Sequence, residues 1–121
     1  LYPHAGSVDT SEVVSQGYSL NLPLYCVSGK AAHSSYSLVS TDKDNIIIET
    51  VKKAEDSSDT VIRAYETWNK TTDCVYIFDR VPKSVYVCNL LEENEEQLEV
   101  NGSTVVLRFK PFEIKTVKVT F

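Results

Sequence analysis

The chain has 121 residues, a net charge of −5 and 42% apolar residues, which is enough to form one buried core. Its twelve lysines and arginines are dispersed among seventeen acidic residues, so no basic stripe follows a nucleic-acid backbone. No window reaches the ~18 apolar residues of a membrane-spanning helix, and no basic region followed by an apolar one marks the N-terminus. We therefore expect a single domain without a nucleic-acid or membrane partner.

The first 34 residues mix glycine, serine, proline and histidine and show no sustained period. Only residues 9–16 are a candidate for a short helical or irregular turn. Residues 18–27 alternate apolar with polar positions, and Pro23 denies this segment a central place in a sheet. We expect an irregular strap along a sandwich edge over residues 1–34, with a loop at 29–35.

From residue 35 onward, short runs rich in Val, Ile, Tyr, Phe and Thr recur between polar turn segments, a pattern typical of an all-β domain. In one run Val105, Leu107 and Phe109 share a face, while Arg108 and Lys110 point the other way. The fold class predicted is an antiparallel β-sandwich of about seven to eight strands over residues 35–121. The expected strands are 36–40, 45–53, 60–67, 73–79, 84–90, 97–100 paired with 104–109, and 113–121.

A hairpin is predicted where Asn101-Gly102 separates two of these runs. The Asn-Gly dipeptide tolerates the two positive φ angles of a type I′ turn. We therefore expect residues 97–100 and 104–109 to pair directly with each other.

Residues suited to catalysis or metal binding are sparse. The two histidines, His4 and His33, have no His or Cys companion at metal-ligand spacing. The cysteines Cys26, Cys74 and Cys88 form an odd set without a close pair, which argues against a disulfide framework and for a reduced, cytoplasmic setting. We predict no catalytic residue, no metal ligand and no cofactor within this chain.

Two charged residues, Arg63 and Glu66, interrupt an apolar strand. Facing Glu49 or Lys52 on a neighbouring strand, they would form cross-strand ion pairs. Contact with a ligand is the alternative.

The aromatic residues of this region have two interpretations. They either pack in the core or line a sugar-binding face, because sugars stack on exposed rings. The set is Tyr65, Trp68, Tyr76, Phe78 and Tyr86. Trp68, at the end of a strand, tests the second interpretation most directly. The candidate residues for a substrate rim or an interface are therefore Arg63, Glu66 and Trp68.

Six segments carry a resemblance through their shared order and spacing. They are residues 1–6 (Leu-Tyr-Pro-His-Ala-Gly), 17–24 (Gly-Tyr-Ser-Leu-Asn-Leu-Pro-Leu), 48–56 (Ile-Glu-Thr-Val-Lys-Lys-Ala-Glu-Asp), 61–66 (Val-Ile-Arg-Ala-Tyr-Glu), 89–92 (Asn-Leu-Leu-Glu) and 111–116 (Pro-Phe-Glu-Ile-Lys-Thr). Together they resemble the C-terminal β domain of α-mannosidases of glycoside hydrolase family 38, especially the cytosolic and bacterial branch.

The resemblance implies a parent enzyme that hydrolyses terminal α-linked mannose with retention of configuration, using an aspartate nucleophile, an acid/base carboxylate and a zinc ion. None of those motifs occurs in this chain. The resemblance therefore implies a non-catalytic domain that packs against and stabilises the catalytic domain of the same polypeptide, with a mannoside as the parent's substrate. It also implies that the sequence is cut from a larger protein at Leu1 and that Phe121 is a natural C-terminus.

Two other hypotheses compete with that of a non-catalytic mannosidase domain. The chain could be a free-standing carbohydrate-binding or adhesion module whose aromatic face recognises the sugar. It could also be a hydrolase in its own right, which its lack of a catalytic constellation disfavours.

Overall fold

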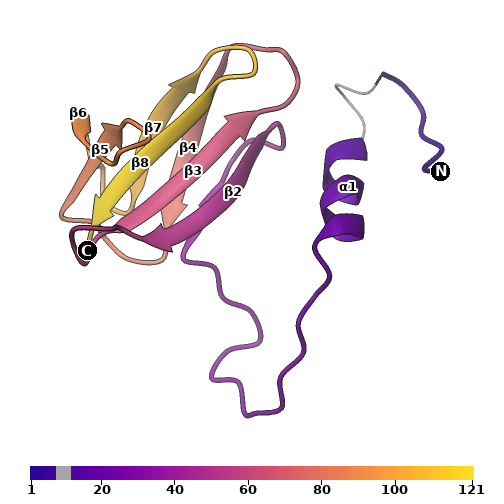
Figure 1. Cartoon of the computed structure of the whole chain (residues 1–121), viewed down its shortest axis with the longest axis horizontal. Coiled ribbons are helices and arrows are strands. Elements are labelled where there is room, and N and C mark those ends of the chain that lie inside the picture. Colours follow the sequence, from indigo (N-terminus) through magenta and orange to yellow (C-terminus); the bar gives the residue numbers. More distant parts are fainter. Residues whose placement is uncertain (8–11) are drawn as a thin grey trace. The chain divides into compact units, whose positions relative to one another are not determined.

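A computed structural model describes residues 1–7 and 12–121, which divide into the units Leu1–Tyr36 and Ser37–Phe121. The second unit contains eight strands in two antiparallel sheets, one in the order β1-β4-β7 and the other in the order β2-β3-β8-β5-β6 (Figure 1). The strands are β1 (Val39–Thr41), β2 (Ile46–Lys53), β3 (Thr60–Glu66), β4 (Thr72–Phe78), β5 (Ser84–Cys88), β6 (Asn94–Leu98), β7 (Thr104–Phe109) and β8 (Ile114–Thr120). The predicted all-β antiparallel sandwich is confirmed.

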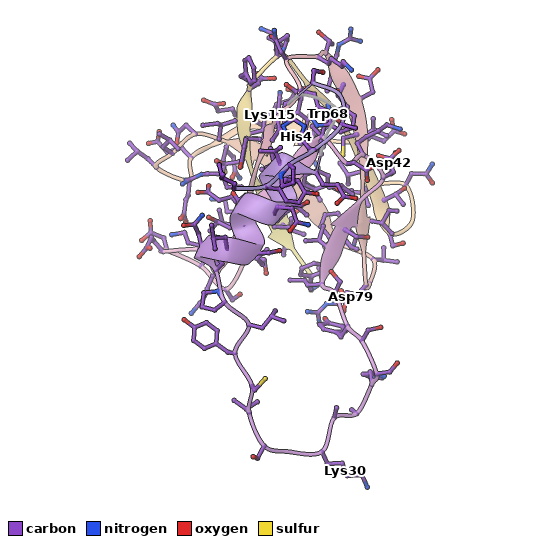
Figure 2. All side chains as sticks on the ribbon, turned by 90° about the vertical axis from the view of Figure 1, so that its right-hand side faces the viewer. His4, Lys30, Asp42, Trp68, Asp79 and Lys115 are labelled. Atoms are coloured by element: carbon purple, nitrogen blue, oxygen red, sulfur yellow. The ribbon has the colours of Figure 1, made fainter. Side chains whose placement is uncertain are left out.

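The core lies between the two sheets and follows the predicted alternation. In β7, Val105, Leu107 and Phe109 are buried, whereas Val106 and Arg108 are exposed. Because each such side chain contributes roughly 1.5–3 kcal/mol when it leaves water, the alternation fixes which face of each strand turns inward. Asp42 and Asp79, labelled in Figure 2, mark the two ends of the pairing between β1 and β4.

The turn after Asn101 differs from the prediction. Only an isolated bridge joins Asn101 to Thr104, and β6 and β7 belong to different sheets. The positive φ falls on Gly102 (+59°) and not on Asn101, so the turn centres on Gly102-Ser103 with the φ signs of type II′. The predicted direct pairing is wrong because β6 pairs with β5, and the chain then crosses from one sheet to the other.

The first unit contains one helix, α1 (Val13–Asn21). Residues 13–16 of the predicted turn are helical, whereas residues 9–11 lie outside the described residues. The extended segment predicted over residues 18–27 is wrong at its start, because Tyr18 belongs to α1 and its carbonyl accepts a hydrogen bond from Leu22 N–H (2.8 Å). The helix ends just before Pro23, since a proline disfavours helical backbone in the residue before it.

Residues 22–36 contain no helix or strand, which agrees with the loop predicted at 29–35. Lys30 lies in this extended segment (Figure 2). The described part of the chain includes no helix with the length and apolar character needed to cross a bilayer.

Candidate functional site

A buried carboxylate closes one end of the sandwich. Glu66, the last residue of β3, is 1% exposed and points inward like Ala64, two residues earlier on the same strand. Its Oε1 accepts hydrogen bonds from Asn45 Nδ2 (2.8 Å) and Trp68 N–H (2.6 Å). Its Oε2 accepts a hydrogen bond from Phe112 N–H (3.0 Å). One carboxylate therefore binds donors from three separate segments.

These donors come from three of the connections at one end of the sandwich (Figure 1). Asn45 precedes β2, Trp68 follows β3, and Phe112 lies between β7 and β8. Asn45 also donates to Thr72 Oγ1 (2.8 Å) at the start of β4. We call this region, residues 43–45, 66–72 and 110–113, the Glu66 end. Asn45 and Phe112 were not among the residues predicted for a site.

The hydrogen bonds favour the ionised form of Glu66. Burial raises the pKa of this carboxyl, but donors from Phe112, Asn45 and the backbone of Trp68 and Lys70 together hold its pKa below the ordinary value. The ion pairs formed among the described residues do not include Glu66. Neutral N–H groups therefore take the place that a cation was predicted to occupy.

Two residues of the Glu66 end adopt left-handed backbone conformations, Asn69 (φ +55°) and Phe112 (φ +55°). Asparagine tolerates this region, but a bulky aromatic residue rarely occupies it. Phe112 follows Pro111 in a turn closed by the hydrogen bond from Glu113 N–H to Lys110 O (3.1 Å). The second central position of such a turn favours glycine, so the backbone of Phe112 is strained.

Arg63 lies on the opposite side of β3 from Glu66. It falls between the core residues Ile62 and Ala64, so its side chain faces away from the core. Its Nε donates a hydrogen bond to Thr116 Oγ1 on β8 (3.2 Å). The sequence grouped Arg63 with Glu66, but the two side chains belong to different faces of the sheet.

The predicted cross-strand ion pairs are wrong. The register of β2 against β3 shifts after Ile48 and skips Glu49, so Thr50 lies opposite Arg63. Lys52 instead forms an ion pair with Glu92 (2.7 Å). A strand irregularity of this kind has no signature in the alternation of apolar residues.

A hollow of about 410 Å³ lies on the same outer face as Arg63. Its lining includes Cys88 and Thr116, with Glu95 and Glu113 as acidic groups. Burial raises the pKa of the Cys88 thiol, so the sulfur is protonated at neutral pH and is a poor nucleophile.

The aromatic residues divide between core and surface. Tyr76 and Phe78 belong to the core, with ring centroids 6.5 Å apart in an edge-to-face arrangement, which confirms core packing for these two. The other three are partly buried: Tyr65, Trp68 and Tyr86. Lys70 Nζ lies 5.3 Å from the centroid of the Trp68 ring, within cation–π distance. Figure 2 labels Trp68 at the Glu66 end, where it remains a candidate for contact with another molecule.

No group of three or more His, Cys, Asp or Glu within residues 1–7 and 12–121 is arranged to hold a metal ion. His4 lies beside Tyr2, with ring centroids 6.4 Å apart. All three cysteines are free, Cys26 being exposed and the other two buried. Burial raises the pKa of the Cys74 thiol to about 12, which keeps it protonated.

The fold defines a two-layer, antiparallel β-sandwich domain. Residues 45–117 match the family described as the glycosyl hydrolases family 38 C-terminal beta sandwich domain. The chain belongs to this family, and the resemblance drawn from the sequence is confirmed.

Three curated relatives are similar to nearly the whole chain. Alpha-mannosidase G of Dictyostelium discoideum is 34% identical over 98% of this chain. Alpha-mannosidase 2C1 of Homo sapiens is 31% identical over 94% of it, and that of Mus musculus is 29% identical over 97%. The match covers only 12% of each relative, so the chain spans about an eighth of their length.

Proposed function

We propose that this chain is a non-catalytic C-terminal domain of an α-mannosidase, and that it packs against and stabilises the catalytic part of the same polypeptide. The observation that carries the proposal is its similarity, over 98% of its length, to a protein named alpha-mannosidase G. By the family resemblance, the whole protein would hydrolyse terminal α-linked mannose with retention of configuration.

The chemistry of the described residues supports a structural contribution. A general acid must release its proton to the substrate, but the Glu66 oxygens already accept hydrogen bonds from Trp68 and Phe112. Burial keeps the Cys74 and Cys88 thiols protonated. We therefore assign the nucleophile, the acid/base carboxylate and the zinc ion implied by the resemblance to the part of the protein outside this chain.

We also propose that the protein works in the cytoplasm. The support is that its three cysteines are free, although one of them, Cys26, is exposed. Free thiols persist in the reducing cytoplasm, whereas oxidising compartments favour disulfides.

An activity assay tests the main proposal. The longer polypeptide that carries this chain should hydrolyse an aryl α-mannoside, and proton NMR of the first product should show the α anomer. The 121-residue chain alone should release no product under the same conditions. Absence of activity in the folded longer polypeptide, or activity in the chain alone, contradicts the proposal.

A carbohydrate-binding module is the second candidate, and the hollow lined by Glu95 and Glu113 is the observation in its favour. Titration calorimetry of the chain with methyl α-mannoside distinguishes the two. Saturable binding, lost in Glu95→Ala and retained in Asp73→Ala on the other sheet, supports the module. No heat at millimolar sugar supports the packing domain.

A further inference from the structure

We propose that Trp68 and Phe112 form the surface through which this domain contacts the rest of the α-mannosidase polypeptide, and that Glu66 is the residue that positions them. The inference rests on the proposed function, because its partner is the catalytic part of that polypeptide. The partner surface is apolar and carries carboxylates.

A single rigid group fixes the backbone of both aromatic residues. Trp68 N–H donates to one oxygen of the Glu66 carboxylate (2.6 Å), and Phe112 N–H donates to the other (3.0 Å). The planar carboxylate therefore sets the distance between two connections that are far apart in sequence. Because Glu66 is 1% exposed, the surrounding core restricts its movement.

The backbone of Phe112 is strained, and its side chain gains no burial inside the chain that would offset this strain. Its φ is +55°, yet its side chain is 63% exposed and adds little to the core. Glycine would form the same turn without the steric conflict of a Cβ atom. A bulky aromatic residue at this position is explained if its ring is buried by a contact made outside the chain.

The surroundings of the two rings define the chemistry of the partner. Ile114, two residues beyond Phe112, is also 63% exposed and extends the apolar surface. Lys70 lies over the Trp68 ring, and Lys110 begins the turn that contains Phe112. Neither lysine forms an ion pair with a described residue, although the chain carries a net charge of −5. An apolar surface with acidic groups satisfies both features.

The length of the relatives indicates that the partner of this surface is the rest of the same polypeptide. The matched region is 12% of each α-mannosidase, so most of such a polypeptide lies beyond this domain. A domain tethered to that polypeptide meets it at high effective concentration, so even a small aromatic surface is sufficient for docking.

Phe112→Gly tests the proposal, because it should have opposite effects in two settings. In the 121-residue chain, the substitution removes backbone strain and should raise the Tm by ~3 °C. In the longer polypeptide, it also removes the docked ring and should lower the Tm of the transition that releases this domain by ~5 °C. Val106→Thr is the matched control, since Val106 is 60% exposed on the other sheet and should leave both Tm values unchanged.

The same Tm change in both settings overturns the proposal. So does a rise in KM for the mannoside with an unchanged release transition, because that result assigns the ring to the substrate. Failure of the proposed function is a separate result, since it is an absence of mannosidase activity in the unaltered polypeptide.

A double-mutant cycle tests the positioning role of Glu66. If Glu66 holds Phe112 in place for docking, Phe112→Gly should lower the release Tm less in a Glu66→Gln background than in the unaltered protein. Additive losses would show that Glu66 only stabilises the fold and would remove the positioning part of the proposal. If Glu66→Gln does not fold, Glu66→Asp, which keeps the charge, replaces it in the cycle and is judged by the same criterion.

Discussion

Two carboxylates organise connections of this sandwich, and they do so with different partners. Glu66 accepts hydrogen bonds from neutral N–H groups and is 1% exposed. Glu92, between β5 and β6, forms an ion pair with Lys52 (2.7 Å) and accepts a hydrogen bond from Glu55 N–H (2.9 Å). Its backbone carbonyl also accepts a hydrogen bond from Lys118 Nζ. Both carboxyl groups have a lowered pKa.

The comparison shows that a lowered pKa does not by itself identify how a carboxylate acts. Dissolved salt screens the interaction of Glu92 with Lys52, because the lysine side chain is 38% exposed. Salt reaches the hydrogen bonds of Glu66 less readily, because Glu66 is 1% exposed and these hydrogen bonds are buried or partly buried. We therefore expect salt to weaken the interactions of Glu92 more than those of Glu66.

The largest effect is expected for Glu66→Ala. It removes the acceptor of three buried or partly buried donors and leaves a cavity, so it should lower the free energy of unfolding by ~3–5 kcal/mol. Urea unfolding followed by the fluorescence of Trp68, the only tryptophan, measures the change. Glu66→Gln, which keeps the shape and one acceptor, is the control and should lose less. Equal losses in the two variants would contradict this prediction, because they would mean that the cavity left by alanine adds nothing to the loss of the carboxylate.

The pH dependence of stability gives the second effect. The pKa of Glu66 is lower in the folded chain than its ordinary value of 4.5, so the folded state binds this proton less readily than the unfolded state. The contribution of the ionised Glu66 to the free energy of unfolding is complete above about pH 4.5. It is lost as the pH falls through the lower pKa that Glu66 has in the folded chain. The urea midpoint of the unaltered chain should therefore approach that of Glu66→Gln as the pH falls from 7 to about 3. A constant difference between the two proteins would contradict the shift.

The sequence predicted the sandwich well because its core depends on local alternation. Val105, Leu107 and Phe109 face inward for the same reason in the sequence and in the structure. The sequence also drew attention to Glu66 and Trp68, as a charge within an apolar strand and a ring at its end. It did not supply the partners of Glu66, because Asn45 and Phe112 are 21 and 46 residues away.

The predicted pairing of the two strands that flank Asn101 was wrong for a related reason. Local turn chemistry is satisfied by a bridge between Asn101 and Thr104, but it does not determine whether the flanking strands continue to pair. Here β6 pairs with β5 and β7 pairs with β4, so packing of the whole sandwich decides the outcome. A local sequence pattern carries no information about which distant segments contact each other.

Glu92→Gln should destabilise the chain less than either change at Glu66, because the Lys52 side of its ion pair is solvated. Its urea midpoint should lie below that of the unaltered chain in dilute buffer, and the difference should shrink in about 1 M NaCl. The difference produced by Glu66→Gln should persist at the same salt concentration. If salt reduces both differences equally, enclosure by protein is not what distinguishes the two carboxylates.

The smallest effect is expected for Asp73→Asn. Asp73 and Arg108 face each other across β4 and β7 at 3.7 Å, with side chains 64% and 71% exposed. Both groups keep their hydration, so the pair contributes little and its loss should leave the urea midpoint unchanged within error at any salt concentration. The order Glu66, Glu92, Asp73 would then follow the exposure of the three residues, which is 1% for Glu66 and, for the side chains, 11% for Glu92 and 64% for Asp73. A loss for Asp73→Asn larger than that for Glu92→Gln would show that position in the sheet, and not exposure, sets the order.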